Sequence, residues 1–214
     1  MKKFGISIIA LAILGMTAAF ITPPVNEALE IGAAAPATAT KMQDVSGKMM
    51  SLQDLKKENG LLVIFSCNTC PFVVGAPGYG TGWEGRYNDV YEQAKQAGVG
   101  MVLVNSNEAK REGADSFEKM QERAKSHNYA SPYVVDKNSA LADAFGAKTT
   151  PHVFLFDGDM KLIYKGAIDD QNADASKVTT PWLKDALQLT GQGQASSIDP
   201  NTTRNKGCSI KRMR

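Results

Sequence analysis

The amino-acid sequence predicts an α/β fold, and three observations lead to this prediction. Apolar runs of strand length alternate with longer segments of helical periodicity along the chain. Two of these runs, 61–65 and 99–105, are continuously apolar, as in strands that are covered on both faces. A last pair of runs, 152–156 and 161–165, flanks the turn Asp157-Gly158-Asp159 and is typical of an antiparallel hairpin. Alternating strands and helices imply right-handed crossovers and a mostly parallel sheet, to which the hairpin adds an antiparallel edge.

Local signals place the elements of the first half in order. The turn at Ser46-Gly47 predicts a short hairpin, and residues 52–57 predict a short helix before the strand at 61–65. The stretch "GAPGYGTG" (75–82) holds four glycines and a proline, which do not readily continue a helix. We therefore expect a surface loop there.

The second half continues the alternation. Thr180-Pro181 opens the last helix, and Gly191 closes it. Asp115-Ser-Phe-Glu118 resembles a capping box and predicts a helix start. The other expected elements are a helix over 84–97, a short strand over 133–136, and a helix over 140–145 that ends at Gly146.

Composition limits the classes of function. The chain has 214 residues, of which 43% are apolar, enough for one domain with a real core. The formal charge is +2, and without Lys2 and Lys3 the basic and acidic residues balance at 22 each. No basic field therefore indicates a nucleic-acid partner.

The N-terminus is typical of a targeting segment. A basic "MKK" precedes an uncharged apolar run over residues 4–21, and small residues at 17–19 suit a signal peptidase. We predict a signal peptide over 1–19. The run is also long enough to span a bilayer, so an uncleaved anchor that attaches the chain to a membrane through residues 4–21 remains open. Either way, we expect the rest of the chain outside the cytoplasm, in the periplasm or on the outer face of the cytoplasmic membrane.

Composition shifts divide the remaining chain into three parts. Residues 20–40 are rich in small residues and are expected to form a linker, and residues 41–191 carry the predicted elements of the domain. Residues 192–214 are polar and then basic, and we expect this C-terminal tail to be loosely held.

Three cysteines carry the candidate chemistry. Cys67 and Cys70 form a Cys-x-x-Cys pair directly after the strand at 61–65, and Cys208 lies far away in the tail. A thiolate attacks a disulfide, and a second thiol one turn away can attack the resulting mixed disulfide and release the product. In an oxidising compartment the pair is expected to rest as a disulfide.

Several stretches at fixed positions resemble the thioredoxin-like superfamily, and within it an exported redoxin group related to alkyl hydroperoxide reductases and thiol-specific antioxidants. The stretches, which together cover about residues 30–212, are "EIGAAAPATATKMQDVSGKMMSLQDL", "FSCNTCPF", "VNSN", "DSFEKMQERA", "FGAKTTPHVFLFDGDMKLIYKG" and "GCSIK". The resemblance implies a thioredoxin-like fold: a central mixed sheet flanked by helices, with an N-terminal hairpin and a helix-strand insertion.

The resemblance also implies roles for individual residues. It implies that Pro151 is cis and packs against the cysteine pair, which would leave the backbone of Thr150 free to bind a substrate. Two departures concern the activity: the Pro-x-x-x-Thr/Ser-x-x-Cys pattern of peroxiredoxins is absent before Cys67, and Asn68-Thr69 replaces the Gly-Pro of thioredoxin. The glycine-rich stretch falls where the family has a helix, and is expected to shorten it.

The sequence thus predicts a thiol–disulfide oxidoreductase outside the cytoplasm. Cys67 is expected to attack, the more buried Cys70 to resolve, and Thr150 and Pro151 to shape the substrate groove. Expected partners are thiol or disulfide proteins and a thiol electron donor. No nucleotide or flavin motif indicates a cofactor.

Other interpretations remain open at this stage. One is a peroxiredoxin-like thiol peroxidase, and another is copper binding or delivery by Cys67, Cys70 and His152. A third is a binding module without catalysis. Cys208 has three interpretations: a redox thiol that pairs with Cys67, a docking residue, or a spare thiol.

Overall fold

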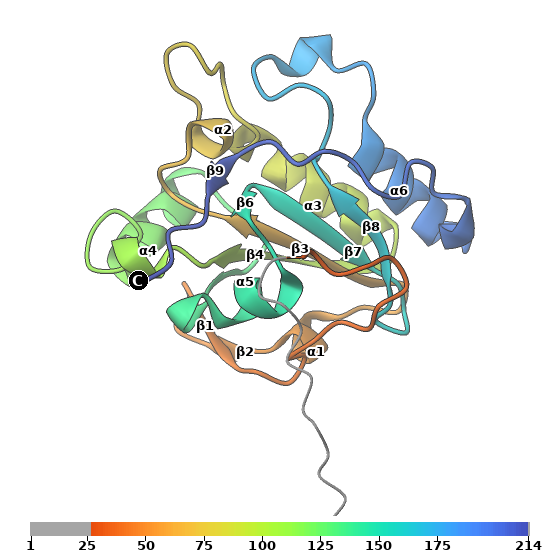
Figure 1. Ribbon diagram of the computed structural model, residues 1–214, viewed down its shortest axis with the longest axis horizontal. Helices are drawn as coiled ribbons and strands as arrows, with labels where there is room; N and C mark the ends of the chain where they lie inside the picture. Colours follow the sequence, from red (N-terminus) through yellow and green to blue (C-terminus); the bar gives the residue numbers. More distant parts are fainter. Residues whose placement is uncertain (1–26, 214) are drawn as a thin grey trace, which may run out of the picture.

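The computed structural model describes residues 27–213 and contains a seven-stranded mixed sheet in the order β2-β1-β5-β4-β3-β7-β8 (Figure 1). A separate two-stranded sheet joins β6 to β9. The strands are β1 (Met42–Asp44), β2 (Met49–Met50), β3 (Gly60–Ser66), β4 (Val99–Asn105), β5 (Tyr133–Val135), β6 (Thr149–Thr150), β7 (His152–Phe156), β8 (Leu162–Gly166) and β9 (Cys208–Ser209).

The pairing of the strands confirms a mixed sheet and corrects the expectation that it is mostly parallel. Only the neighbours β3–β4 and β4–β5 run parallel in the seven-stranded sheet. Both edges are antiparallel: β1 pairs with β5 and β2, while β7 pairs with β3 and β8. The first hairpin joins the sheet beside β5, so it adds two antiparallel strands that the α/β alternation does not predict.

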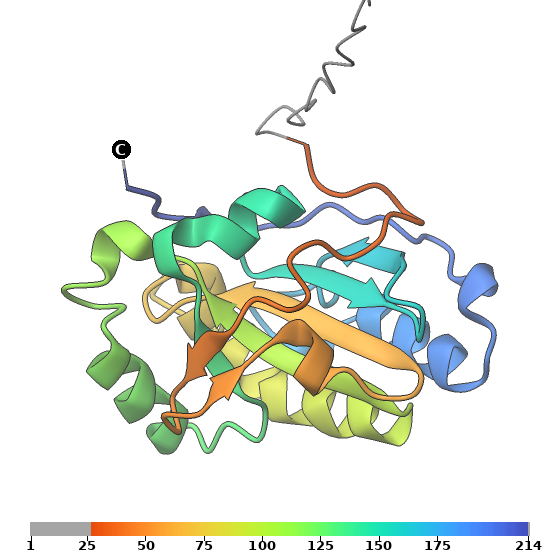
Figure 2. The ribbon, with the colours of Figure 1, turned by 90° about the horizontal axis from the view of Figure 1, so that it is seen from below.

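Helices cover the sheet on both faces, as Figure 2 shows. The helices α3 and α6 lie together on one face, whereas α1 and α5 lie on the other. The bounds are α1 (Leu52–Leu55), α2 (Pro71–Val74), α3 (Tyr87–Gln96), α4 (Phe117–Ser126), α5 (Ala140–Phe145) and α6 (Trp182–Gly191).

The core consists of two apolar layers that the central strands separate. Alternate residues of β3 face opposite sides, with Leu62 and Ile64 in the layer under α3 and α6. Leu61, Val63 and Phe65 lie in the layer under α1 and α5. Because both faces are buried, the strand is a continuous apolar run.

Both ends of the described chain pack on the domain. In the expected linker, the amides of Leu29 and Ala35 donate to the carbonyls of Phe145 and Met160, at 3.1 and 2.8 Å. The C-terminal tail runs from α6 past β6 (Figure 1), and near its end the carbonyl of Lys211 accepts from the amide of Ala109 at 2.8 Å. It hydrogen bonds to β8 through Asn201 and pairs with β6 through β9, so the expectation of a loosely held tail is wrong for this stretch.

The predicted signal peptide lies outside the described residues. Between residues 27 and 213, no helix is both long and apolar enough to cross a bilayer.

Candidate active site

The register of β3 and β7 brings the cysteine pair to the Thr150-Pro151 segment. Phe65 pairs with His152, so the next residues outward, Cys67 on one strand and Thr150 on the other, face each other at the carboxyl end of β3. The Thr150–Pro151 peptide bond is cis. The hydroxyl of Thr150 is 3.1 Å from the Sγ atom of Cys67.

The two thiols of the pair are buried, and both contact Thr150. Their side chains are 1% and 3% exposed for Cys67 and Cys70, respectively, which gives no support to the prediction that Cys70 is the deeper one. The amide of Cys70 donates to Cys67 Sγ at 3.3 Å. Cys70 Sγ donates to the carbonyl oxygen of Thr150 at 2.9 Å. Thr150 therefore contacts both sulfur atoms.

The surroundings shift the pKa values of the two thiols in opposite directions. A hydrogen bond from Cys67, together with those from Cys208 and Thr150, lowers the pKa of Cys70 to about 5 against the opposing effect of burial. The same hydrogen bond with Cys70, together with burial, raises the pKa of Cys67 well above its usual value. The carbonyl of Thr150 can accept only from the protonated Cys70, whereas the other donors favour its thiolate. Because the two thiols titrate as a coupled pair, the first proton is lost from the pair as a whole, and the hydrogen bonds donated to Cys70 favour the thiolate there.

Cys70 begins helix α2, which is only four residues long. Pro71 follows it at the first helical position, and Gly75 ends the helix with φ +76°. The glycine-rich loop then folds back, and the amide of Trp83 donates to the carbonyl of Phe72 at 3.0 Å. The predicted loop and the predicted shortening of the helix are therefore both confirmed.

A buried carboxylate holds the loop between the cysteines. Asp115 is fully buried, and its Oδ1 atom accepts from the amide of Asn68 at 2.8 Å. The side chains of Asn105 and Asn107 also donate to Asp115, at 2.8 and 3.0 Å. Tyr133 completes the network by donating to Asn68 Oδ1 at 3.0 Å. These four hydrogen bonds hold Asn68, and with it the loop between the two thiols, against the buried carboxylate of Asp115.

The sequence analysis missed this role of Asp115. It placed Asp115 at the start of a helix, but Ser116 is the residue that caps α4, through a bond from the Lys119 amide at 3.3 Å. No local sequence pattern indicates this role, because the partners of Asp115 come from the end of β4 and from the loop between the cysteines.

The third cysteine also lies at this site. Cys208 is in β9, where it pairs with Thr150, and its amide donates to Cys70 Sγ at 3.3 Å. The resemblance implied that the backbone of Thr150 is free to bind a substrate. In the structure it is not free, because the chain's own tail pairs with it. Burial and the neighbouring Cys70 raise the pKa of Cys208 to about 11.

The two histidines lie apart from the thiol chemistry. His152 is 4% exposed and stacks near Phe154, and burial lowers its pKa to about 3. His127 is the C-cap of α4. Among residues 27–213, no group of three or more His, Cys, Asp or Glu side chains is placed to hold a metal ion. The aromatic residues Trp83 and Tyr87 pack in the core.

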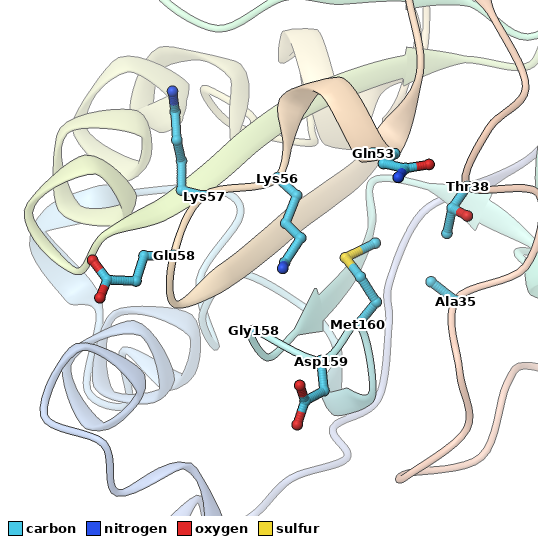
Figure 3. Close-up of a pocket in the computed structure, with 9 residues that line it drawn as sticks. All are labelled: Ala35, Thr38, Gln53, Lys56, Lys57, Glu58, Gly158, Asp159 and Met160. Carbon is cyan, nitrogen blue, oxygen red and sulfur yellow. The ribbon is translucent and has the colours of Figure 1, made fainter.

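A surface hollow of about 760 Å³ lies at the opposite end of the sheet (Figure 3). Lys56 and Lys57 line it just before β3 begins, and Gly158 and Met160 line it just after β7 ends. The cysteines follow the other end of β3, so this hollow does not belong to the thiol site.

Comparison with known proteins identifies a family and structures of similar fold. The Redoxin family model matches residues 30–180. Curated proteins give no match. A conserved protein of uncharacterised function from Geobacillus kaustophilus is 28% identical, with 86% of this chain and 93% of that chain covered and a TM-score of 0.74. A hypothetical protein from Sinorhizobium meliloti is 27% identical, with 87% and 97% covered and a TM-score of 0.75.

A third structure shares only the fold. It is the thioredoxin domain of a thiol-disulfide oxidoreductase from Bacteroides vulgatus, 22% identical, with 65% of this chain and 90% of that chain covered and a TM-score of 0.50. The fold is therefore thioredoxin-like, as the sequence predicted.

Proposed function

The chain belongs to the Redoxin family, and from this premise we propose that it is a thiol–disulfide oxidoreductase that works through Cys67 and Cys70. The observation that carries the proposal is the meeting of both buried sulfur atoms at Thr150, beside a carboxylate network that fixes the loop between them. Two thiols held this close can alternate between a dithiol and a disulfide.

We also propose a direction of attack, which the hydrogen bonds around Cys70 support. The sequence suggested that Cys67 attacks. The thiolate is the reactive form of a cysteine, and the hydrogen bonds donated to Cys70 favour its thiolate, which supports Cys70 as the attacking residue. Cys70 then attacks a substrate disulfide and forms a mixed disulfide, while the other substrate sulfur leaves as a thiolate. Cys67 next gives up its proton and attacks Cys70 Sγ, which forms the Cys67–Cys70 disulfide and releases the second substrate thiol.

The substrates and the location are part of the proposal. The partners are thiol or disulfide proteins, with another thiol protein as electron donor. The N-terminal targeting pattern supports a site of action outside the cytoplasm. Thr150 and Pro151, which lie beside the cysteine pair, are proposed to contact the substrate.

Trapping of mixed disulfides tests this assignment. All variants in this experiment are full chains that also carry Cys208→Ser. When glutathione disulfide is added, the Cys67→Ser variant should accumulate a mixed disulfide between Cys70 and glutathione. The matched variant Cys70→Ser should label slowly at Cys67, because it removes the hydrogen bond with the Cys70 thiol but keeps the burial that also raises the pKa of Cys67. Peptide mass mapping after acid quenching identifies the labelled cysteine.

The opposite pattern, rapid labelling of Cys67 and none of Cys70, would return the attacking role to Cys67. No adduct in either variant would refute the oxidoreductase. Rapid oxidation by hydrogen peroxide but not by glutathione disulfide would favour the peroxidase instead.

A further inference from the structure

The C-terminal strand β9 occupies the backbone edge that lies beside the cysteine pair. Thr150 pairs with Cys208, and Thr149 pairs with Ser209, in an antiparallel ladder. Adding an extended strand to an exposed edge is a common way to bind a peptide. Here the bound strand is part of the same chain, and it carries a thiol opposite Thr150.

Close packing before Cys208 fits the tail to this edge. A Cβ atom on Gly207 would collide with the carbonyl oxygen of Thr150, so only glycine allows the approach. Next to it, the Nζ atom of Lys206 lies 5.6 Å from the centre of the Phe72 ring, on the helix that Cys70 begins.

Contacts on both sides of Cys208 hold the tail in this register. The side chain of Asn205 donates to Thr149 Oγ1 at 2.6 Å, and the amide of Ile210 donates to the Lys148 carbonyl at 3.0 Å. The amide of Lys211 donates to Asn107 Oδ1 at 2.8 Å. Because Asn107 also binds Asp115, the tail is attached to the network that fixes the cysteine loop.

We propose that Cys208 is a built-in disulfide partner of Cys70, so that the tail acts as a thiol substrate within the chain. The proposal rests on the proposed exchange chemistry of Cys67 and Cys70. Cys208 loses its proton and its thiolate attacks Cys70 Sγ in the Cys67–Cys70 disulfide. The Cys67–Cys70 bond breaks, the Cys70–Cys208 bond forms, and Cys67 leaves as a thiolate that takes up a proton. The step transfers no net electrons and needs no external oxidant.

The groups around Cys208 favour its thiolate more strongly when Cys70 is oxidised. Part of what raises the pKa of Cys208 is the neighbouring Cys70. Once Cys70 is part of a disulfide it carries no charge and is a much weaker acceptor for the Cys208 thiol, so this effect is largely lost. Lys211, which lowers the pKa of Cys208, remains in place. Cys208 is therefore a better nucleophile when Cys70 is oxidised than when it is reduced.

Disulfide mapping on the full chain tests the proposal. The Cys67→Ser variant is treated with glutathione disulfide, quenched in acid, alkylated and digested. A Cys70–Cys208 disulfide should be the main product, because Cys208 displaces glutathione from Cys70. A stable Cys70–glutathione adduct with Cys208 alkylated would overturn the proposal.

Three further variants separate this proposal from the proposed function. Cys208→Ser should still form the Cys67–Cys70 disulfide, whereas loss of all disulfides in every variant would refute the exchange chemistry as a whole. Gly207→Ala should slow Cys70–Cys208 formation severalfold, since it pushes β9 from Thr150. Gly85→Ala is the matched control, because a Cβ atom there meets nothing within 4 Å. Equal rates in the two glycine variants would contradict the placement of the tail.

Discussion

At the scale of single residues, the site is a chain of three thiols that share one backbone segment. Thr150 contacts Cys67 through its hydroxyl, Cys70 through its carbonyl, and Cys208 through strand pairing. The central sulfur, Cys70, receives hydrogen bonds from both sides and is the most acidic of the three. The chemistry of the protein therefore depends on what donates to Cys70.

The first titration of the thiols tests this dependence. Ultraviolet thiolate absorbance should show a first step at pH about 5, above which Cys70 is ionised and below which exchange should slow. In the Cys67→Ala variant the largest cause of this low pKa is lost, so the step should move toward the usual value of about 8.5.

Cys208→Ser serves as the control for this titration. It also removes one thiol, but it keeps Cys67, the backbone amide of residue 208 and a side-chain hydroxyl that can donate to Cys70, so its first step should stay much closer to 5 than that of Cys67→Ala. An unchanged first step in Cys67→Ala would show that Cys67 does not set the acidity of Cys70.

The sequence predicts part of this site. The spacing of Cys67 and Cys70 after a buried strand is a local pattern, and the Thr-Pro loop is recognised by resemblance. The role of Asp115 and the partner of Cys208 could not be predicted in this way. Both depend on contacts between segments far apart in the sequence, such as Asn68 with Asp115 and Thr150 with Cys208.

At the scale of elements, the helix after Cys70 is cut short by the glycine-rich loop. Gly75 ends α2, and Gly82 brings the chain back against Val73. Elements with strong local signals are predicted well: the helix expected over 140–145 is α5, and Gly146 follows it with φ +61°. The helix expected at 52–57 is shorter, because Lys56 already leaves the helical conformation.

Two glycine variants of this loop separate backbone strain from packing. Gly78→Ala should lower the free energy of unfolding by roughly 1–2 kcal/mol, the cost of a left-handed Ala. Its φ is +82° and no atom lies within 4 Å of its Cβ position. Gly82→Ala should cost more, because its φ is +71° and its Cβ would also collide with the backbone of Val73.

Urea unfolding of the two variants measures this difference. If both lose the same stability, the return of the loop onto α2 does not depend on a glycine at residue 82.

At the scale of the whole molecule, the alternation of strands and helices predicts the class of fold but not the direction of every strand. The antiparallel edge formed by the hairpin of β7 and β8 is predicted and confirmed, whereas the N-terminal hairpin joins antiparallel to β5 without a signal in the alternation. The path of the tail is also a property of the whole fold, since it joins β8, β6 and the cysteine network in succession. Its polar and basic composition alone resembles that of a loose terminus.

The central claim is that Cys67 and Cys70 exchange electrons as a pair, and one measurement tests it most directly. The full chain is equilibrated across a glutathione or dithiol redox series, the thiols are trapped with an alkylating agent, and the peptides are mapped. The account predicts a reversible Cys67–Cys70 disulfide with a potential between about −120 and −270 mV, the span of known exchangers. Cys67 and Cys70 that remain fully alkylated across the whole series would contradict it.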